Sequence, residues 1–348
     1  MAPDADLAAD RGEQARPATA ESLKPPRVTV CACTYKRPDG LAALLNGLKN
    51  QAFSSVPTPR WDVVIADNEG SAEARAICET FRESSPIPIT YVHEPRRGIS
   101  HARNACLDRV PGDGDFFAMI DDDEIPEPDW LEQLLRAQRA TDADVVLGRV
   151  LPMFDASAPA WIKEGGFFGS PSRRPGDEER ISYVDLQEIG GAATNNVLVR
   201  CSAYRRLSLT FDPERGLTGG SDSLFFRLMT FAGYRIVFAS NSKVWETVPS
   251  ERTTMRYLLQ SEYRSGNLKL CNKLQARKAD AGRLETTRMA LKLFGRGLGE
   301  IALGSFDVVR AAFKRRLRMD GIAMGAMRVA GGCGMLASLL GLRFEHYR

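Results

Sequence analysis

Histidine and closely spaced cysteine pairs are scarce in this chain of 348 residues. It has only His93, His101 and His346, and of its seven cysteines only Cys31 and Cys33 lie close together. So few imidazoles argue against a histidine zinc site and against Ser-His-Asp hydrolysis. No CxxC motif occurs, and alternate residues of a strand point to opposite faces, so we expect reduced thiols in a cytoplasmic protein.

No long apolar segment opens the sequence. Residues 1–22 are polar, Ala-rich and acidic, unlike a signal peptide, so residues 1–26 are expected to form a disordered tail. The rest is expected to be globular, since 43% of the chain is hydrophobic. Residues 255–348 contain 18 Lys and Arg against 7 Asp and Glu, a charge of +11, whereas residues 1–254 carry −8. This asymmetry predicts a second surface with its own partner.

The most distinctive local pattern is an apolar run that ends in four acids. Phe-Phe-Ala-Met-Ile at residues 116–120 is followed by Asp-Asp-Asp-Glu at residues 121–124. If the run is a strand of an open α/β sheet, its acids lie at the ligand-binding edge, and three aspartates there need a cation. Carboxylate oxygens suit Mg²⁺ or Mn²⁺ and leave positions for substrate phosphates. The alternative is that Asp122 or Asp123 caps a helix over residues 127–139.

Strand and helix patterns alternate up to the acidic run. Apolar, β-branched segments at residues 27–34, 61–66 and 87–92 alternate with helical spacings that begin near residues 38, 72 and 98. Polar residues follow the first two strands, at residues 34–37 and 67–68. This βαβαβαβ order predicts a mostly parallel sheet whose ligand site lies at the strand tips.

The pattern is less regular after the acidic run. Strands are expected at residues 145–148, 195–199 and 234–239, and a helix is expected to begin near residue 221. Residues 151–180 are rich in Pro, Gly and aromatics without a clear period, which is typical of a functional loop. Trp161, Phe167 and Phe168 could stack on a sugar there, although core packing is the more common role of aromatic residues.

The basic region after residue 254 has amphipathic and apolar parts. Ile301, Ser305, Val309, Phe313 and Leu317 recur every fourth residue on one helical face, and residues 314–318 are mostly basic. Gly321–Leu342 is long enough to span a bilayer, at roughly 20 residues, but Arg328 and six glycines favour a shallow insertion. We therefore expect a membrane-associated helical region over residues 255–348. Helices packed on the rest of the chain or on a second copy are the alternative.

Taken together, these motifs resemble family 2 of the inverting glycosyltransferases, which have the GT-A fold, and in particular bacterial exopolysaccharide enzymes of the succinoglycan type. The resemblance extends from about residue 28 to about residue 266. It implies a Rossmann-like, mostly parallel α/β sheet flanked by helices over residues 27–254, followed by the C-terminal membrane-associating extension. Its six parts are residues 34–38, Asp67, residues 98–104, the acidic run, residues 219–222 and residues 245–252.

The resemblance assigns residues to the donor and the metal. Asp123 is implied to bind Mn²⁺ or Mg²⁺, with Asp121 near the ribose. Many relatives have a histidine after the last strand where this chain has Glu246, so Glu246 is the candidate third ligand, and a salt bridge to Arg252 is the alternative. Arg103 either contacts the nucleotide or pairs with the acidic run. The implied donor-binding residues are Thr34, Tyr35, Arg37, Asp67, Arg103, Asp121 and Asp122.

The resemblance also implies a catalytic base and an acceptor site. Asp222 occupies the position of the base that deprotonates the acceptor hydroxyl, and its alternative is a helix cap. Ser221 stands where the family usually has a glutamate, which leaves the orienting role of that glutamate open. Trp161 and Asn196 are the candidate acceptor contacts.

The expected activity is inverting, metal-dependent transfer of a sugar from a nucleotide sugar, usually linked to uridine diphosphate (UDP), to a lipid-linked saccharide. This would take place in polysaccharide biosynthesis at the cytoplasmic face of the bacterial inner membrane. The alternatives are a polyprenyl-phosphate sugar synthase and a catalytically silent nucleotide-sugar-binding scaffold. Nucleic acid is not expected as a partner, because the basic residues lie on apolar-faced helices without interleaved aromatics.

Overall fold

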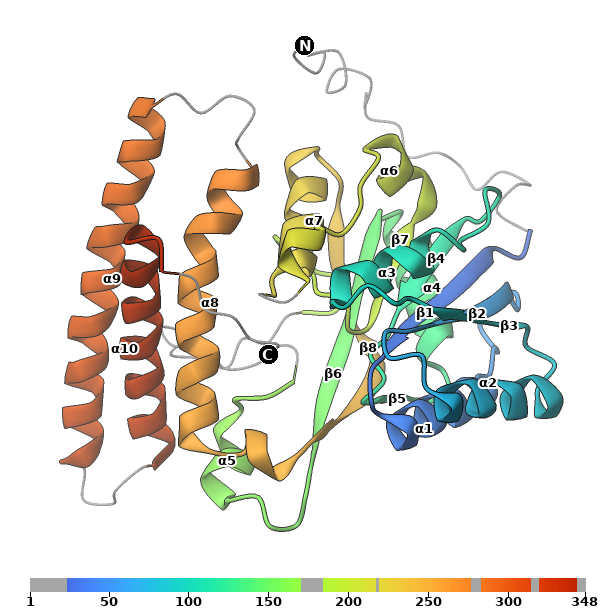
Figure 1. The fold of residues 1–348 in the computed structure, drawn as a ribbon, viewed down its shortest axis with the longest axis horizontal. Helices are drawn as coiled ribbons and strands as arrows, with labels where there is room; N and C mark the ends of the chain where they lie inside the picture. The colour runs from blue at the N-terminus through green and yellow to red at the C-terminus, as the bar shows by residue number, and fades with distance from the viewer. Residues whose placement is uncertain (1–23, 170–183, 217–218, 277–282, 314–318, 343–348) are drawn as a thin grey trace. The chain divides into compact units, whose positions relative to one another are not determined.

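The structure is a computed structural model that describes residues 24–169, 184–216, 219–276, 283–313 and 319–342. The chain divides into two compact units, coloured along the sequence in Figure 1. The first unit comprises residues 1–148, 184–216 and 221–244, and the second comprises residues 149–183, 217–220 and 245–348. The expected domain boundaries at residues 26 and 254 stay predictions.

Four parallel strands form one half of an eight-stranded sheet. Strand β1 pairs in parallel with β2 and β4, and β2 pairs in parallel with β3. The expected βαβαβαβ order is therefore confirmed, and the carboxyl ends of these strands share one edge. The elements are β1 (Arg27–Thr34), α1 (Pro38–Lys49), β2 (Arg60–Asp67), α2 (Ala72–Ser84), β3 (Ile89–His93), α3 (Ile99–Leu107) and β4 (Phe116–Met119).

Apolar periodicity explains why these elements form. Val28 and Val30 of β1 and Val63 of β2 are completely buried, as expected for a sheet covered on both faces. Helix α1 begins with Pro38, whose fixed φ suits the first helical turn, and its leucines at residues 41, 44, 45 and 48 are all buried. Each such side chain contributes about 1.5–3 kcal/mol on burial.

The rest of the sheet contains the antiparallel strand β7 and was harder to predict from the sequence. β7 pairs antiparallel with both β4 and β6, and the full order is β3-β2-β1-β4-β7-β6-β8-β5. β6 and β8 continue well beyond their expected ends, and β5, only three residues long, was not expected. The remaining elements here are β5 (Glu124–Pro126), α4 (Trp130–Thr141), β6 (Val145–Phe154), β7 (Val197–Arg200), α6 (Cys201–Arg206), η3 (Pro213–Arg215), α7 (Ser221–Phe231) and β8 (Ile236–Val248).

Helix α4 begins later than its sequence pattern suggested. Its N-terminal flanking residue is Asp129, which makes no capping side-chain hydrogen bond. Asp122 and Asp123 precede β5, so neither caps α4, and the capping alternative for these two acids is wrong. The acidic run is thus separated from the helix by a strand that pairs with β8.

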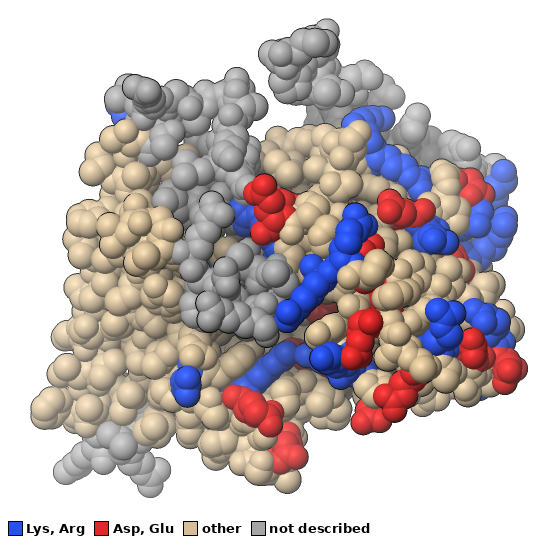
Figure 2. Space-filling model, viewed as in Figure 1, with Lys and Arg blue, Asp and Glu red and all other residues tan. Residues whose placement is uncertain are grey.

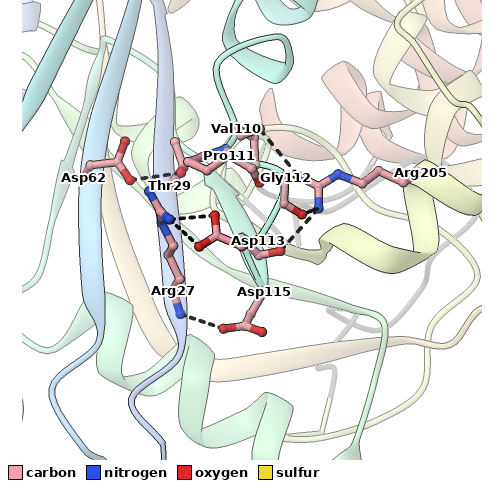
Figure 3. Close-up of polar contacts among 10 residues, drawn as sticks. Arg27, Thr29, Asp62, Val110, Pro111, Gly112, Asp113, Asp115 and Arg205 are labelled. Atoms are coloured by element: carbon pink, nitrogen blue, oxygen red, sulfur yellow. Dashed lines mark hydrogen bonds and ion pairs between the residues drawn. The ribbon is translucent and has the colours of Figure 1, made fainter.

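A network of arginines fixes the amino end of the parallel strands (Figure 3). The Arg27 Nη1 donates to both carboxylate oxygens of Asp113 at 2.6 Å, and its backbone N–H donates to Asp115 Oδ2 at 2.8 Å. Arg205 of α6 donates to the carbonyl oxygens of residues 110, 111, 112 and 114 at 2.6–3.5 Å. These contacts satisfy the carbonyls of the turn that leads into β4.

The second unit is dominated by three long helices. They are α8 (Met255–Ala276), α9 (Arg283–Ala312) and α10 (Met319–Leu339), accompanied by α5 (Ala160–Gly165) and η4 (Ser250–Arg252). Helix α10 packs along both α8 and α9, which touch each other far less. Glycines allow this close approach, because a Cβ atom at Gly266 would collide with the backbone of Gly331. Among the described residues, α10 is the one helix long and apolar enough to cross a membrane.

Candidate active site

The carboxyl ends of β1 and β2 meet the acidic run. Thr34, the last residue of β1, pairs in register with Asp67, the last residue of β2. The Thr34 hydroxyl donates to Asp122 Oδ2 at 2.9 Å, which ties β1 to the loop after β4. Three of the residues implied to bind the donor therefore lie at adjacent strand ends, as the parallel sheet predicted.

Arg37 bridges two of the aspartates. Its Nη1 donates to Asp122 Oδ1 at 2.9 Å and to Asp123 Oδ2 at 2.8 Å. The turn that presents Arg37 contains Lys36 in the left-handed region, with φ 56°, which is uncommon for a residue other than glycine. At Gly40 a Cβ atom would collide with the backbone carbonyl of Asp122, so only glycine lets α1 approach the acidic loop this closely.

Burial and unequal charge define the electrostatics of this cluster. The Asp122 carboxylate is buried, and the resulting desolvation raises its pKa even though Arg37 and Thr34 act in the opposite direction. Desolvation disfavours charged Arg37, but Asp123 and Asp122 outweigh it and raise the Arg37 pKa. Arg37 is thus shared by two aspartates, with Asp121 adjacent in the chain, and carboxylates gathered in one loop favour a bound cation.

The chemistry of these side chains suits a cation shared with a substrate. Within the described ranges, no group of three or more His, Cys, Asp or Glu side chains is arranged to hold a metal ion by itself. Mg²⁺ and related hard ions are usually held by one or two carboxylates and complete their coordination with water and phosphate oxygens. The acidic loop fits that second arrangement.

Asp67 organises the turn after β2. Its buried carboxylate accepts from the backbone N–H groups of Glu69 and Ser71, at 2.8 and 2.9 Å, and from the Tyr91 hydroxyl at 2.7 Å. Burial, together with this contact to Asp67, raises the Tyr91 pKa. The side chain thereby fixes the entry to α2, and its implied contact with the donor stays a prediction.

Asn68 has a role that sequence reasoning missed. Its Nδ2 donates to the carbonyls of Glu94 and Arg96 at 2.8 Å, and its Oδ1 accepts from Gly98 N–H at 2.8 Å. These bonds fix the connection from β3 to α3. The only available signal was its place in a polar pair after a strand, which does not distinguish a binding residue from a structural one.

Arg103 connects α3 to the beginning of α7. Its Nη1 donates to the buried Ser221 hydroxyl at 3.2 Å, and its guanidinium lies 5.5 Å from the Phe211 ring centroid. Asp222 follows in the first turn of α7, where its Oδ1 accepts from Ser223 N–H at 2.7 Å. The structure therefore places Arg103 beside the residue that replaces the usual glutamate and next to the expected base. Both a cap-like contact and a catalytic role are compatible with the position of Asp222.

Asn196 is built into the sheet. It is completely buried, its Oδ1 accepts from Trp130 Nε1 at 2.7 Å, and its Nδ2 donates to the Ser242 carbonyl at 3.0 Å. Its own carbonyl accepts from Gly148 N–H at 2.8 Å. These bonds connect β6, α4 and β8, so the structure gives Asn196 a supporting role, and its acceptor contact stays a prediction.

The candidates Trp161 and Glu246 lie in the second unit. Trp161 packs edge-on against Phe167 at 5.9 Å between ring centroids, within an apolar cluster that includes α10 residues. Glu246 Oε1 lies 3.4 Å from Arg252 Nη1. The contacts proposed as alternatives, core packing and a salt bridge, are thus present, while the acceptor and metal roles stay predictions.

Comparisons with known proteins agree with this geometry. The profile of Glycosyl transferase family 2 matches residues 29–208. Succinoglycan biosynthesis protein ExoM of Rhizobium meliloti (strain 1021) is 34% identical over 322 residues, covering 92% of this chain and 95% of that protein. Glucosyl-dolichyl phosphate glucuronosyltransferase of Haloferax volcanii is 23% identical, covering 69% of this chain and 75% of that protein.

A solved structure shares the fold. The mannosyltransferase PcManGT from Pyrobaculum calidifontis, in complex with GDP-Man and Mn²⁺, superposes with a TM-score of 0.54 at 18% identity, covering 90% of this chain and 88% of that one. The predicted GT-A architecture, a sheet flanked by helices, is therefore confirmed. The family resemblance suggested by the six motifs is confirmed as well, and the protein is a glycosyltransferase. The chain belongs to Glycosyl transferase family 2.

Proposed function

We propose that this enzyme transfers a sugar, with inversion and with a divalent metal, from a UDP-linked nucleotide sugar to a lipid-linked saccharide. The transfer would serve polysaccharide biosynthesis at the cytoplasmic face of the bacterial inner membrane. The name of the 34% identical relative concerns succinoglycan biosynthesis, which supports a role in exopolysaccharide assembly. A lipid-carried acceptor is supported by the more distant relative, whose name specifies a glucosyl-dolichyl phosphate.

The observation that carries the proposal is the cluster of Thr34, Arg37, Asp122 and Asp123 at the ends of β1 and β4. Its surplus of carboxylates would attract a cation, and Arg37 could then turn from the acids toward a diphosphate. Asp123 is the proposed metal ligand, and Glu246 the proposed additional one. When bound, the metal would neutralise the negative charge that develops on the departing diphosphate.

The protein's own residues would carry the proton transfer. The acceptor hydroxyl oxygen attacks the anomeric carbon from the face opposite the diphosphate, so the new C–O bond forms as the sugar–phosphate bond breaks. The Asp222 carboxylate takes the hydroxyl proton, and the nucleoside diphosphate leaves with the bonding electrons. Arg103, bonded to Ser221, is proposed to fix the first turn of α7 and thereby position Asp222.

A screen of nucleotide sugars for release of nucleoside diphosphate tests the proposal. With Mn²⁺ and a lipid-linked saccharide extract, we expect release from a UDP-linked sugar that stops when EDTA is added. Release only with polyprenyl phosphate as acceptor would show a polyprenyl-phosphate sugar synthase. Donor binding without release under any condition would show a scaffold and contradict the proposal.

A further inference from the structure

Helix α9 presents an apolar face that the bundle does not use. Five of its large apolar side chains, together with Phe313 directly after its end, recur at spacings that place them on one side. Each is between 47% and 87% exposed: Leu291, Phe294, Leu298, Phe306, Val309 and Phe313. Isolated exposed apolar residues are common on protein surfaces, but a row of them on one side of a helix marks an interaction surface.

The opposite side of α9 is the one that packs. Leu293, Gly297, Gly304 and Ala311 are buried there. A Cβ atom at Gly304 would collide with the carbonyl of Gly325 on α10, and one at Gly297 would crowd Leu336. The bundle therefore occupies a different face from the apolar row.

Charge is distributed unevenly around α9. Among the α9 side chains that the structure describes, the acids Glu300 and Asp307 accept hydrogen bonds from Arg328 of α10, at 2.7 and 2.9 Å. Desolvation of Arg328 is outweighed by these two carboxylates, and its pKa is raised. These two acids are therefore engaged by α10, and basic residues lie beside the apolar row.

Four basic residues border the apolar row: Arg288, Lys292, Arg296 and Arg310, all exposed. The first three are spaced four residues apart, so they form a second row along the helix. Arg296 and Arg310 also lie 3.8 and 3.5 Å from Glu300 and Asp307, yet both side chains remain 58% exposed. In Figure 2 the described part of α9, at the left, shows mostly uncharged surface.

We infer that this face of α9 lies in the interface of an anionic lipid membrane. The apolar row enters the acyl-chain boundary, and the basic row contacts lipid phosphates. A second copy of the chain fits less well, because pairing two such faces would bring two rows of cations together. The inference rests on the proposed function and deepens it. A lipid-linked acceptor lies in a membrane, and α9 would hold the enzyme at that membrane.

In this inference α10 is a part of the helical bundle, although its length and composition would allow it to cross a membrane. Arg328 is bonded to α9, and the glycines of α10 are in close contact with α8 and α9. If α10 left the bundle and entered a bilayer, both sets of contacts would be broken. The expectation of a shallow insertion by Gly321–Leu342 stays a prediction, and α9 offers a second, separate surface for the membrane.

Vesicle sedimentation of the full-length protein tests the apolar row. Phe306→Ser/Phe313→Ser should weaken binding to phosphatidylcholine–phosphatidylglycerol vesicles at least tenfold, since two aromatic side chains leave the interface. Phe231→Ser is the matched control, because Phe231 is 55% exposed on α7 in the first unit, close to the 64% of Phe306. Equal losses in both variants, or no binding by the parent protein at low salt, would overturn the inference.

A second pair tests the basic row. Arg288→Gln/Lys292→Gln should weaken binding to these vesicles roughly thirtyfold and leave binding to pure phosphatidylcholine unchanged. Circular dichroism checks that the helices persist. A concentration-dependent dimer in lipid-free solution that Phe306→Ser/Phe313→Ser dissociates would instead identify the face as a contact between copies and overturn the inference. Nucleoside diphosphate release is measured separately, so failure of the proposed function would not be confused with failure to bind vesicles.

Discussion

At the amino end of the parallel strands, Arg27 pairs with the carboxylate of Asp113, whereas at the carboxyl end Arg37 is shared by Asp122 and Asp123. The side chain of Asp113 is 71% exposed, and that of Asp122 is 7% exposed. The two ends therefore differ in both charge balance and solvation. At the amino end the arginine meets an exposed carboxylate, and at the carboxyl end it is shared by two aspartates, one of them buried.

The pKa shifts at the two ends have opposite signs. The Arg27 hydrogen bonds lower the pKa of Asp113, while burial raises the pKa of Asp122. Asp113 is thus stabilised in its charged form, and charged Asp122 costs folding free energy. The two ends therefore respond to a change in pH in opposite directions.

Asp222→Asn should produce the largest effect, a loss of sugar transfer. The amide still accepts the Ser223 N–H but cannot take a proton, so transfer should fall about a hundred- to ten-thousandfold with donor affinity kept. Steady-state transfer assays and calorimetric donor titration measure the two quantities. Asp129→Asn, at the beginning of α4 in the same unit, is the control and should transfer normally. An Asp222→Asn rate within a fewfold of the parent would reduce this residue to a helix cap.

Asp123→Ala should have the next largest effect, a loss of donor affinity. Donor affinity in the presence of Mn²⁺ should fall roughly ten- to hundredfold, the range for a lost charged contact. The melting temperature should hold, because Arg37 remains paired with Asp122 and repulsion between adjacent acids is relieved. Asp113→Ala removes an acid at the other end and should leave donor affinity intact. Equal losses in the two variants would show that the ends do not differ in function.

Arg205→Ala should affect stability and not chemistry. It removes the donor to four carbonyls of the turn before β4 and should lower the free energy of unfolding by about 1–3 kcal/mol. Arg205→Lys should recover only part of the lost free energy of unfolding, since an ammonium cannot present the same planar set of donors. Urea denaturation measures the change. A large loss of transfer by folded Arg205→Ala would contradict the division between the two ends.

Asp122→Asn should give the smallest effect, visible as a change with pH. The folded-state pKa of Asp122 is raised, so the parent protein loses stability as pH rises through that pKa, and the amide variant does not. The free energy of unfolding of the variant should rise relative to that of the parent as the pH increases above the ordinary range of an aspartate, by about 1 kcal/mol or less. Asp113→Asn should show the opposite slope, because the pKa of Asp113 is lowered. Parallel curves for the two variants, obtained by thermal melts, would contradict the assignment.

The parallel half of the fold was predictable because its signals are local. The β-branched run of β1 and the leucines of α1 specify their structures within a few residues. The rest of the sheet depends on pairing between distant segments, because β7 lies between β4 and β6. Neither its position nor the three-residue strand β5 has a local signature.

The candidate site was predictable in location and less so in detail. Thr34, Asp67 and the acidic loop each follow an apolar run. They were therefore predicted to lie together, because the carboxyl ends of parallel strands share an edge of the sheet. The sharing of Arg37 between two aspartates depends on the left-handed turn at Lys36, and no residue type there signalled it. The complete burial of Asn196 depends on Trp130 and Ser242, which lie far away in the sequence.

The pairing of Leu147 with Val197, reinforced by the bond from Gly148 N–H to the Asn196 carbonyl, joins two parts of the chain that lie far apart in the sequence. With both ends held in this way, doubling the length of the segment between them costs only about 0.6 kcal/mol of closure entropy. Evolution or protein engineering can therefore lengthen that segment at little cost in closure entropy. A chimera that receives a longer stretch there would keep β7 paired with β4, the strand that precedes the acidic loop.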